Sequence, residues 1–337
     1  MNHRERNFTH DRLKRRIAAI DESITRYLAE FDRADRQAEV TGVPVPSTKL
    51  SALGGRIEAL KARMHSLSAL EAKLQASGEK QISLTDPDAR AMTSQSHSAY
   101  TVGYNVQSAV DTKHHLIVTH EVTNVGIDKD HLSPMAEQAR QALAAEKIEV
   151  FADKGYFNGE EIAACEDAGI DVYVPKPATS NARARGRFDK DDFVYDREND
   201  RYVCPAGQQL TRRMTCEENG RVLHVYWTSA ECPLKSDCTT RKERRVRRWE
   251  REDVLERAQA RLDGNPGAMQ LRRETVEHPF GTIKAWMGAT HFKMKTLAHV
   301  ATEMALLEAI VAFLSWLSLR MRASIRLAVL ATPTCAR

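Results

Sequence analysis

The chain has 337 residues, of which 42 % are hydrophobic and 28 % are charged, and its formal net charge is only +4. These values are normal for a protein with a proper core, and so weak a positive charge does not by itself indicate nucleic acid. The residues after Met1 contain no apolar stretch, which excludes a signal peptide, and six cysteines do not indicate a secreted disulfide scaffold. The longest apolar run, 306–319, is too short for a bilayer and is broken by Glu308. We therefore expect a cytoplasmic protein without a membrane partner.

The first 78 residues are expected to form a helical hairpin. Apolar side chains recur at steps of three and four over 8–36 and again over 50–74. The intervening stretch, 38–47, contains one glycine and two prolines that break the pattern. Stripes of this kind are far more often packing surfaces than recognition surfaces, so we interpret domain 1–78 as structural.

Residues 79–177 change to a pattern of strands and helices. Strands are expected at 81–86, 100–111, 114–123, 148–153 and 170–177, and helices at 130–146 and 158–169. Only Thr112 and Lys113 separate the second strand from the third, which predicts an antiparallel hairpin. The order β-β-β-α-β-α-β predicts an α/β domain, a mixed sheet with helices on its faces.

Residues 178–265 are polar and rich in turn residues, and we interpret them as a small β-rich insertion. The basic stretch Arg241–Glu252 lies within it and has seven basic residues in twelve. Two interpretations stay open for this stretch: a solvated helix face, or contacts with phosphates. Helical patterning resumes over 266–305, and an atypical tail follows over 306–337.

Three acids stand out by position. Asp86 is expected to end the first strand, Asp153 ends the fourth, and Glu277 lies on the helix after the insertion. Acids at the carboxyl ends of strands are common sites of chemistry in open α/β sheets. Three carboxylates can hold a pair of divalent cations that act on a phosphodiester, and Mg²⁺ suits this role. Taken singly, each acid also has a plain structural explanation, and Asp88 and Asp111 compete with Asp86.

The segments TDPDARAM, GYNVQSAVD, ADKGYF and VEHPFGTIK carry a resemblance that covers roughly residues 7 to 305. Together and in this order they resemble the bacterial insertion-sequence transposases of the DDE class, in the group with a Tyr-Arg-Glu-Lys signature. Arg273 and Lys284 stand at the Arg and Lys places of that signature around Glu277, whereas Gln270 departs from its Tyr place.

The resemblance implies an RNase H-like core in which Asp86, Asp153 and Glu277 are the catalytic, metal-binding acids. The metal would be Mg²⁺, with Mn²⁺ able to replace it. It also implies that Arg273 and Lys284 hold DNA phosphates, and their spacing places them on one helical face with Glu277. Because Pro279 follows closely, we expect a helix start or kink near 278–279.

Two further groups of residues in the insertion are candidates for binding. Arg244, Arg245, Arg247 and Arg248 are candidates for phosphate contacts. Cys204, Cys232 and Cys238 are candidates for a structural zinc site, although Ser229 stands where relatives often have another cysteine. Such a site is one ligand short unless Cys216 or His224 substitutes. The alternative is a set of reduced thiols.

The expected function is a cut-and-paste DNA transposase that hydrolyses phosphodiesters at element ends and joins them to target DNA. Its expected partner is double-stranded DNA, bound by a homodimer at the nucleoid, with no small-molecule substrate. Relatives usually carry an additional N-terminal segment and a different C-terminal helix, so we expect a truncated copy with an altered tail. Two alternatives stay open: an inactive or inhibitory DNA-binding remnant, and an RNase H-like structure-specific nuclease.

Overall fold

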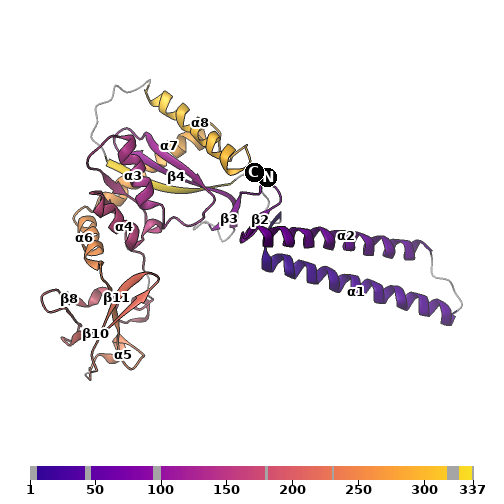
Figure 1. The fold of residues 1–337 in the computed structure, drawn as a ribbon, viewed down its shortest axis with the longest axis horizontal. Helices are drawn as coiled ribbons and strands as arrows, with labels where there is room; N and C mark the ends of the chain where they lie inside the picture. Colours follow the sequence, from indigo (N-terminus) through magenta and orange to yellow (C-terminus); the bar gives the residue numbers. More distant parts are fainter. Residues whose placement is uncertain are drawn as a thin grey trace.

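The structure, a computed structural model, describes residues 6–41, 47–93, 100–178, 181–229, 231–316 and 326–335 (Figure 1). A helical hairpin is followed along the chain by a central α/β core, which a small β insertion interrupts. The hairpin projects from the core as an arm, and the insertion extends from another side of it. No described helix has the length and hydropathy needed to cross a bilayer.

The arm consists of α1 (His10–Thr41) and α2 (Ser47–Ser77), which lie side by side for most of their length. At 1.5 Å per residue, each helix is about 45 Å long. Leu13 of α1 and Leu74 of α2 are fully buried at its base, next to Phe8 and Ile82. Two long helices thus lie where the helical hairpin was expected.

The base of the arm also contains a small sheet that the sequence did not predict. Strand β1 (Asn7–Thr9) pairs antiparallel with β2 (Gln81–Ser83). We expected 81–86 to be the first strand of the main sheet, ending at Asp86, and this was wrong. Pro87 has no N–H to give to a ladder, and a turn from Asp86 to Ala89 follows β2 instead.

The main sheet has the strand order β3-β4-β13-β6-β7, and β5 also pairs with β4. Its strands are β3 (Arg90–Thr93), β4 (Tyr100–Asp111), β5 (Ile117–Thr123), β6 (Glu149–Phe151), β7 (Asp171–Tyr173) and β13 (Arg326–Cys335). Strand β13 runs antiparallel to β4 and parallel to β6, so it joins the two halves of the sheet. The segment expected to be an atypical tail therefore contributes a strand to the middle of the core.

Helices cover both faces of this sheet, as predicted. They are α3 (Leu132–Ala142), α4 (Gly159–Asp167), α6 (Glu252–Asp263), α7 (Ala268–Gly281) and α8 (Leu297–Trp316). Ala109 of β4 packs toward α3 and α4, whereas Val106 and Val110 pack toward α7 and α8. The mixed α/β architecture is thus confirmed, and the two-residue period of β4 assigns its side chains to the two faces.

The insertion folds as a sheet of its own with the order β12-β11-β10-β9-β8. Its elements are β8 (Val194–Asp196), β9 (Arg201–Val203), β10 (Gln209–Glu218), β11 (Arg221–Trp227), α5 (Lys235–Cys238) and β12 (Val246–Trp249). Tyr202, Leu210 and Tyr226 form its small core. The basic stretch Arg241–Glu252 is therefore not a helix face, since its middle is strand β12.

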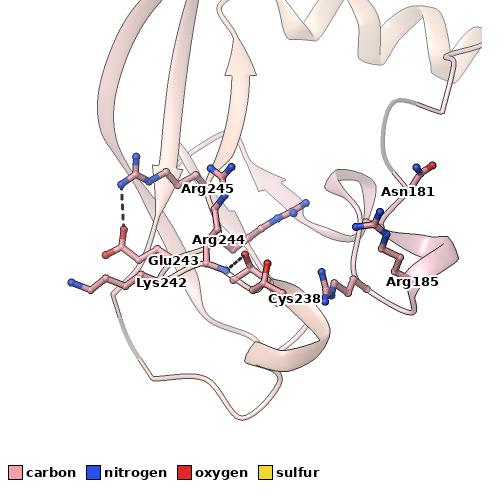
Figure 2. A pocket seen from close by; sticks show the side chains of 12 residues that line it. Asn181, Arg185, Cys238, Lys242, Glu243, Arg244 and Arg245 are labelled. Carbon is pink, nitrogen blue, oxygen red and sulfur yellow. Dashed lines mark hydrogen bonds and ion pairs between the residues drawn. The ribbon is translucent and has the colours of Figure 1, made fainter.

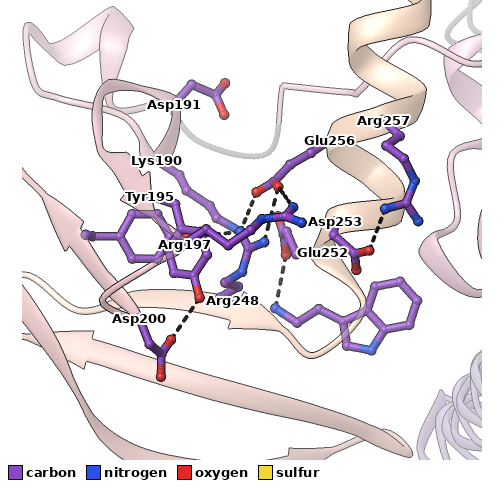
Figure 3. A network of polar contacts seen from close by, with 12 residues as sticks. Lys190, Asp191, Tyr195, Arg197, Asp200, Arg248, Glu252, Asp253, Glu256 and Arg257 are labelled. Atoms are coloured by element: carbon purple, nitrogen blue, oxygen red, sulfur yellow. Dashed lines mark hydrogen bonds and ion pairs between the residues drawn. The ribbon is translucent and has the colours of Figure 1, made fainter.

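Arg248 of β12 ties the insertion to α6 (Figure 3). Its side chain is only 6 % exposed, and both terminal nitrogens bind the carboxylate of Glu256 on α6. The guanidinium carbon lies 3.8 Å from the ring centroid of Tyr195. Helix α6 in turn binds the core, because Arg257 bonds to Glu166 of α4.

We predict that Glu256→Ala destabilises the protein by about 2–3 kcal/mol, because it leaves the buried guanidinium of Arg248 without its acceptor. Urea unfolding followed by tryptophan fluorescence measures this loss. Arg197→Ala is the matched control, since Arg197 lies 3.5 Å from the same carboxylate but is 68 % exposed. Its effect should be within about 0.5 kcal/mol. Equal losses of unfolding free energy in the two variants would show that the ion pair of buried Arg248 with Glu256 does not stabilise the fold.

Candidate functional site

Asp86 lies in the turn between β2 and β3 and is completely buried. Its Oδ1 accepts a hydrogen bond from the Tyr104 hydroxyl at 2.8 Å and from the backbone N–H of Thr296 at 3.1 Å. Its Oδ2 is buried and has no hydrogen-bond partner among the described residues. One carboxylate oxygen is therefore held, and the other is left for a further donor or a cation.

Asp88 lies two residues further on, and its carboxylate caps a helix. Its Oδ2 accepts the backbone N–H of Leu297, the first residue of α8, at 2.9 Å. A carboxylate at this place compensates the unpaired N–H groups and the positive end of the helix dipole. Asp88 is thus occupied by capping α8, and the structure gives it no contact that favours it over Asp86 as a site residue.

Asp153 follows β6 and begins the short 3₁₀ turn Lys154–Tyr156. Its Oδ1 accepts the N–H of Gly155 at 2.7 Å, and its Oδ2 accepts a hydrogen bond from Arg272 of α7 at 3.1 Å. The Asp153 side chain is 41 % exposed, whereas that of Arg272 is 13 % exposed. Arg272 is not among the predicted site residues, whereas its neighbour Arg273 is.

A second carboxylate lies close to Asp153. A Cβ placed on Gly155 would be 2.8 Å from Oδ1 of Asp153 and 3.4 Å from Oδ2 of Asp128, so the two acids flank this glycine. Asp128 Oδ1 is bound by the side-chain amides of Asn105 at 2.7 Å and Gln107 at 3.0 Å. Asp128 is not among the predicted site residues, because its only signal in the sequence is a position in a short loop after a strand.

Tyr156 lies beneath this pair and is fully buried. Its hydroxyl donates a hydrogen bond to Gln107, which itself binds Asp128. Burial, followed by the negative charges of Asp128 and Asp153, raises the pKa of Tyr156 well above its ordinary value. The phenol therefore remains a neutral hydrogen-bond donor over the whole physiological range.

Glu277 lies on α7, on the solvent side of the helix. Its neighbour Val276 packs against Val110 and Phe151, while His278 stacks on His115 with a centroid distance of 4.9 Å. Helix α7 therefore crosses the sheet close to the ends of β4 and β6. Arg273, one helical turn before Glu277, is also exposed.

The helix start or kink expected near 278–279 is not found at that place. Helix α7 continues through Pro279 to Gly281, and a π-helical turn, Thr282–Trp286, follows it. Such turns are rare and are frequently found at functional sites. Lys284 lies in this turn, 5.9 Å from the ring centroid of Phe280, and Trp286 is 89 % exposed.

The three acids are suited in kind to a hard cation, because all of them offer carboxylate oxygens and Asp86 has one without a partner. They are not assembled, however. Among the residues that the structure describes, no three His, Cys, Asp or Glu side chains lie close enough together to hold a metal ion.

The four arginines proposed for phosphate contacts divide into two pairs. Arg244 and Arg245 line an open cavity of the insertion. Arg248 is buried against Glu256, and Arg247 is paired with Glu218 at 2.5 Å. Arg248 is therefore withdrawn from solvent, whereas Arg247 is 59 % exposed and is engaged by Glu218.

Cys204, Cys232 and Cys238 line one cavity of about 450 Å³ in the insertion. All three are unpaired thiols, half-buried, and they come from different segments of the chain. Burial, with a smaller contribution from the other two sulfurs, raises the pKa of Cys238. His224 and Cys216 do not line this cavity, and His224 instead hydrogen-bonds to Thr215.

Comparison with known protein families matches residues 41–314 to the family described as the transposase DDE domain. This range contains all three acids and covers most of the chain. The chain belongs to the DDE transposases. Searches among curated proteins and among solved structures gave no match. DDE transposases are polynucleotidyl transferases that act in DNA transposition, bind DNA and generally use divalent metal ions.

Burial of Tyr104 against Asp86 predicts a loss of stability in alkali. Burial first, and then the hydrogen bond to Asp86, raise the pKa of Tyr104 far above the value of about 10 in an unfolded chain. The folded state keeps the phenolic proton while the unfolded state loses it, so the free energy of unfolding should fall above about pH 10.

We therefore predict that Tyr104→Phe reduces the decline in unfolding free energy between pH 9 and pH 11. Urea unfolding at each pH measures it. Tyr27→Phe, at a half-exposed position on α1, is the control and should leave the decline unchanged. A Tyr104→Phe slope identical to that of the unsubstituted protein would contradict the assignment.

Proposed function

We propose that this chain is a cut-and-paste DNA transposase of the subgroup with the Tyr-Arg-Glu-Lys signature, built on an RNase H-like core. The family match carries the proposal, because it spans Asp86, Asp153 and Glu277 without interruption. The contact between Asp153 and Arg272 supports it, since it brings the helix of Glu277 to the end of β6.

In this proposal Asp86, Asp153 and Glu277 hold Mg²⁺, for which Mn²⁺ can substitute. A bound pair of such ions supplies charge stabilisation for the attacking and leaving oxygens of a phosphodiester. Arg273 and Lys284 bind DNA phosphates beside Glu277. Trp286, exposed on the same π-helical turn, offers a flat surface for a base.

The reaction proceeds in two displacements at phosphorus. Water first attacks a phosphodiester at the element end and leaves a free 3′-hydroxyl. This hydroxyl then attacks a phosphodiester of the target, joins to its phosphorus and expels the target's own 3′-oxygen. Neither displacement needs a Ser or Tyr nucleophile, so the residues of the chain bind, orient and neutralise the DNA strands.

The ion pair of Asp153 with Arg272 bears on how the site would assemble. Because Oδ2 of Asp153 is bound to Arg272, that oxygen becomes a ligand only when the guanidinium moves to another anion. A DNA phosphate is such an anion. DNA binding would thus release the carboxylate, and Arg272 would join Arg273 in contacting the backbone.

A second candidate function is an inactive or inhibitory DNA-binding remnant. The separation of the acids in this conformation favours it. A structure-specific nuclease on the same fold would cut DNA but never join strands. We expect the active form to be a homodimer on double-stranded DNA at the nucleoid, because the reaction requires two element ends.

We predict that Glu277→Gln and Asp153→Asn each lower Mg²⁺-dependent cleavage of end-containing DNA at least about 100-fold, because several kcal/mol of transition-state stabilisation are lost. Glu274→Gln is the control on the same helix, where Glu274 accepts a hydrogen bond from Gln270 at 2.9 Å. It should cleave normally.

Three outcomes of this assay separate the candidates. Cleavage by Glu277→Gln at the normal rate would refute the site. DNA binding without cleavage by the unsubstituted protein would favour the remnant. Cleavage without joining of strands to a target plasmid would favour the nuclease.

We also propose that Cys204, Cys232 and Cys238, which line one cavity, move together to bind a structural zinc ion, since in this conformation they do not lie close enough to hold one. Elemental analysis of purified protein should then give about one zinc per chain, and Cys232→Ser should lose it. Cys165→Ser is the control, because Cys165 is fully buried elsewhere and burial raises its pKa to about 12. Zinc-free protein with a stable insertion would contradict the proposal.

A further inference from the structure

A strongly basic cavity lies on the insertion (Figure 2). It is a cavity of about 700 Å³. Its lining contains one acid, Glu243, and six cationic side chains, which are Arg185, Arg187, Arg241, Lys242, Arg244 and Arg245.

These cations come from two segments that are far apart in the sequence. Arg185 and Arg187 follow the last strand of the first core half, and the other four precede β12. The two segments are connected by the backbone hydrogen bond from Phe188 to Asp237 at 2.8 Å. The fold therefore gathers positive charge that the sequence distributes over more than fifty residues.

Within the part of the chain that the structure describes, most of this charge has no counter-ion. No ion pair in the described ranges involves Arg185, Arg187, Arg241 or Lys242. Arg245 has one long ion pair, in which a guanidinium nitrogen lies 3.7 Å from a carboxylate oxygen of Glu243. By contrast, two nearby arginines outside the cavity have counter-ions, because Arg247 and Arg248 each bind a glutamate. Six like charges around one hollow repel each other unless an anion enters.

Two of the guanidinium groups are held in place by aromatic rings. Arg244 lies 5.4 Å from the ring centroid of Phe193, and Arg245 lies 5.0 Å from that of Trp227. The Nε of Arg244 is buried and has no hydrogen-bond partner in the described structure. Stacked arginines lose less conformational entropy on binding an anion, so the cavity is prepared for a ligand with several negative charges.

We propose that this cavity binds consecutive phosphates of a DNA strand, in addition to the contacts of Arg273 and Lys284 at the acids. The inference rests on the proposed function as a DNA transposase and adds Arg185, Arg187, Arg241 and Lys242 to its DNA contacts. A hollow of this volume admits a phosphodiester segment rather than a whole duplex. Cationic contacts to phosphates position DNA without reading its sequence.

The test measures DNA binding in EDTA, where no cleavage occurs, by fluorescence anisotropy with a labelled single strand and a labelled duplex. Arg185→Gln and Arg187→Gln should each reduce the slope of log K against log salt concentration by about 0.7–0.9, the value for one lost phosphate contact. Arg185→Glu should reduce affinity further. Arg213→Gln on β10 is the control, since it removes the same charge from an exposed position on the sheet of the insertion.

The outcomes separate this inference from the proposed function. If the unsubstituted protein binds neither DNA, the proposed function fails together with the inference. If it binds DNA and the Arg185 and Arg187 variants keep its affinity and salt slope, or lose no more than Arg213→Gln does, the inference alone fails. Loss in the cavity variants, with unchanged thermal unfolding, supports it, and the more affected probe identifies the form of DNA that enters.

Discussion

A buried positive charge determines where the insertion sits. The guanidinium of Arg248 is almost completely removed from water, and such a group is strongly destabilising unless an anion binds it. Glu256 supplies that anion from α6, a helix that packs on α4 of the core. The β sheet of the insertion, and with it the basic cavity, therefore keeps a defined position relative to the core.

In the basic stretch around Arg248, arginines next to each other in one strand have different environments: one is buried and the other is exposed. In β12 the burial alternates, so that Val246 and Arg248 face inward while Arg247 faces outward. The residues before the strand are not constrained by this alternation, and Arg244 and Arg245 turn to the cavity. A helix has 3.6 residues per turn, so the helical interpretation of these residues did not predict that Arg247 and Arg248 lie on opposite faces of a strand.

Much of the architecture could be predicted from local patterns, because the hairpin arm, β4, β5, α3, α4 and the β-rich insertion each follow a clear apolar period. The pairing partners of the strands could not be predicted. The pairs β1–β2 and β4–β13 each connect segments that are far apart in the chain. The site shows the same limit. The signature spacing selects Arg273, and only the orientation of α7 brings Arg272 to Asp153.

The place of β13 has a consequence for the order of folding. Strands β4 and β6 arise early in the chain, but the strand between them comes only after the insertion, α7 and α8. Until it arrives, both strands present unpaired backbone edges, and contacts so distant in sequence form slowly. A nascent chain therefore has a long interval in which a foreign strand could enter the vacant slot, and completion of the core is the slow, late event of its folding.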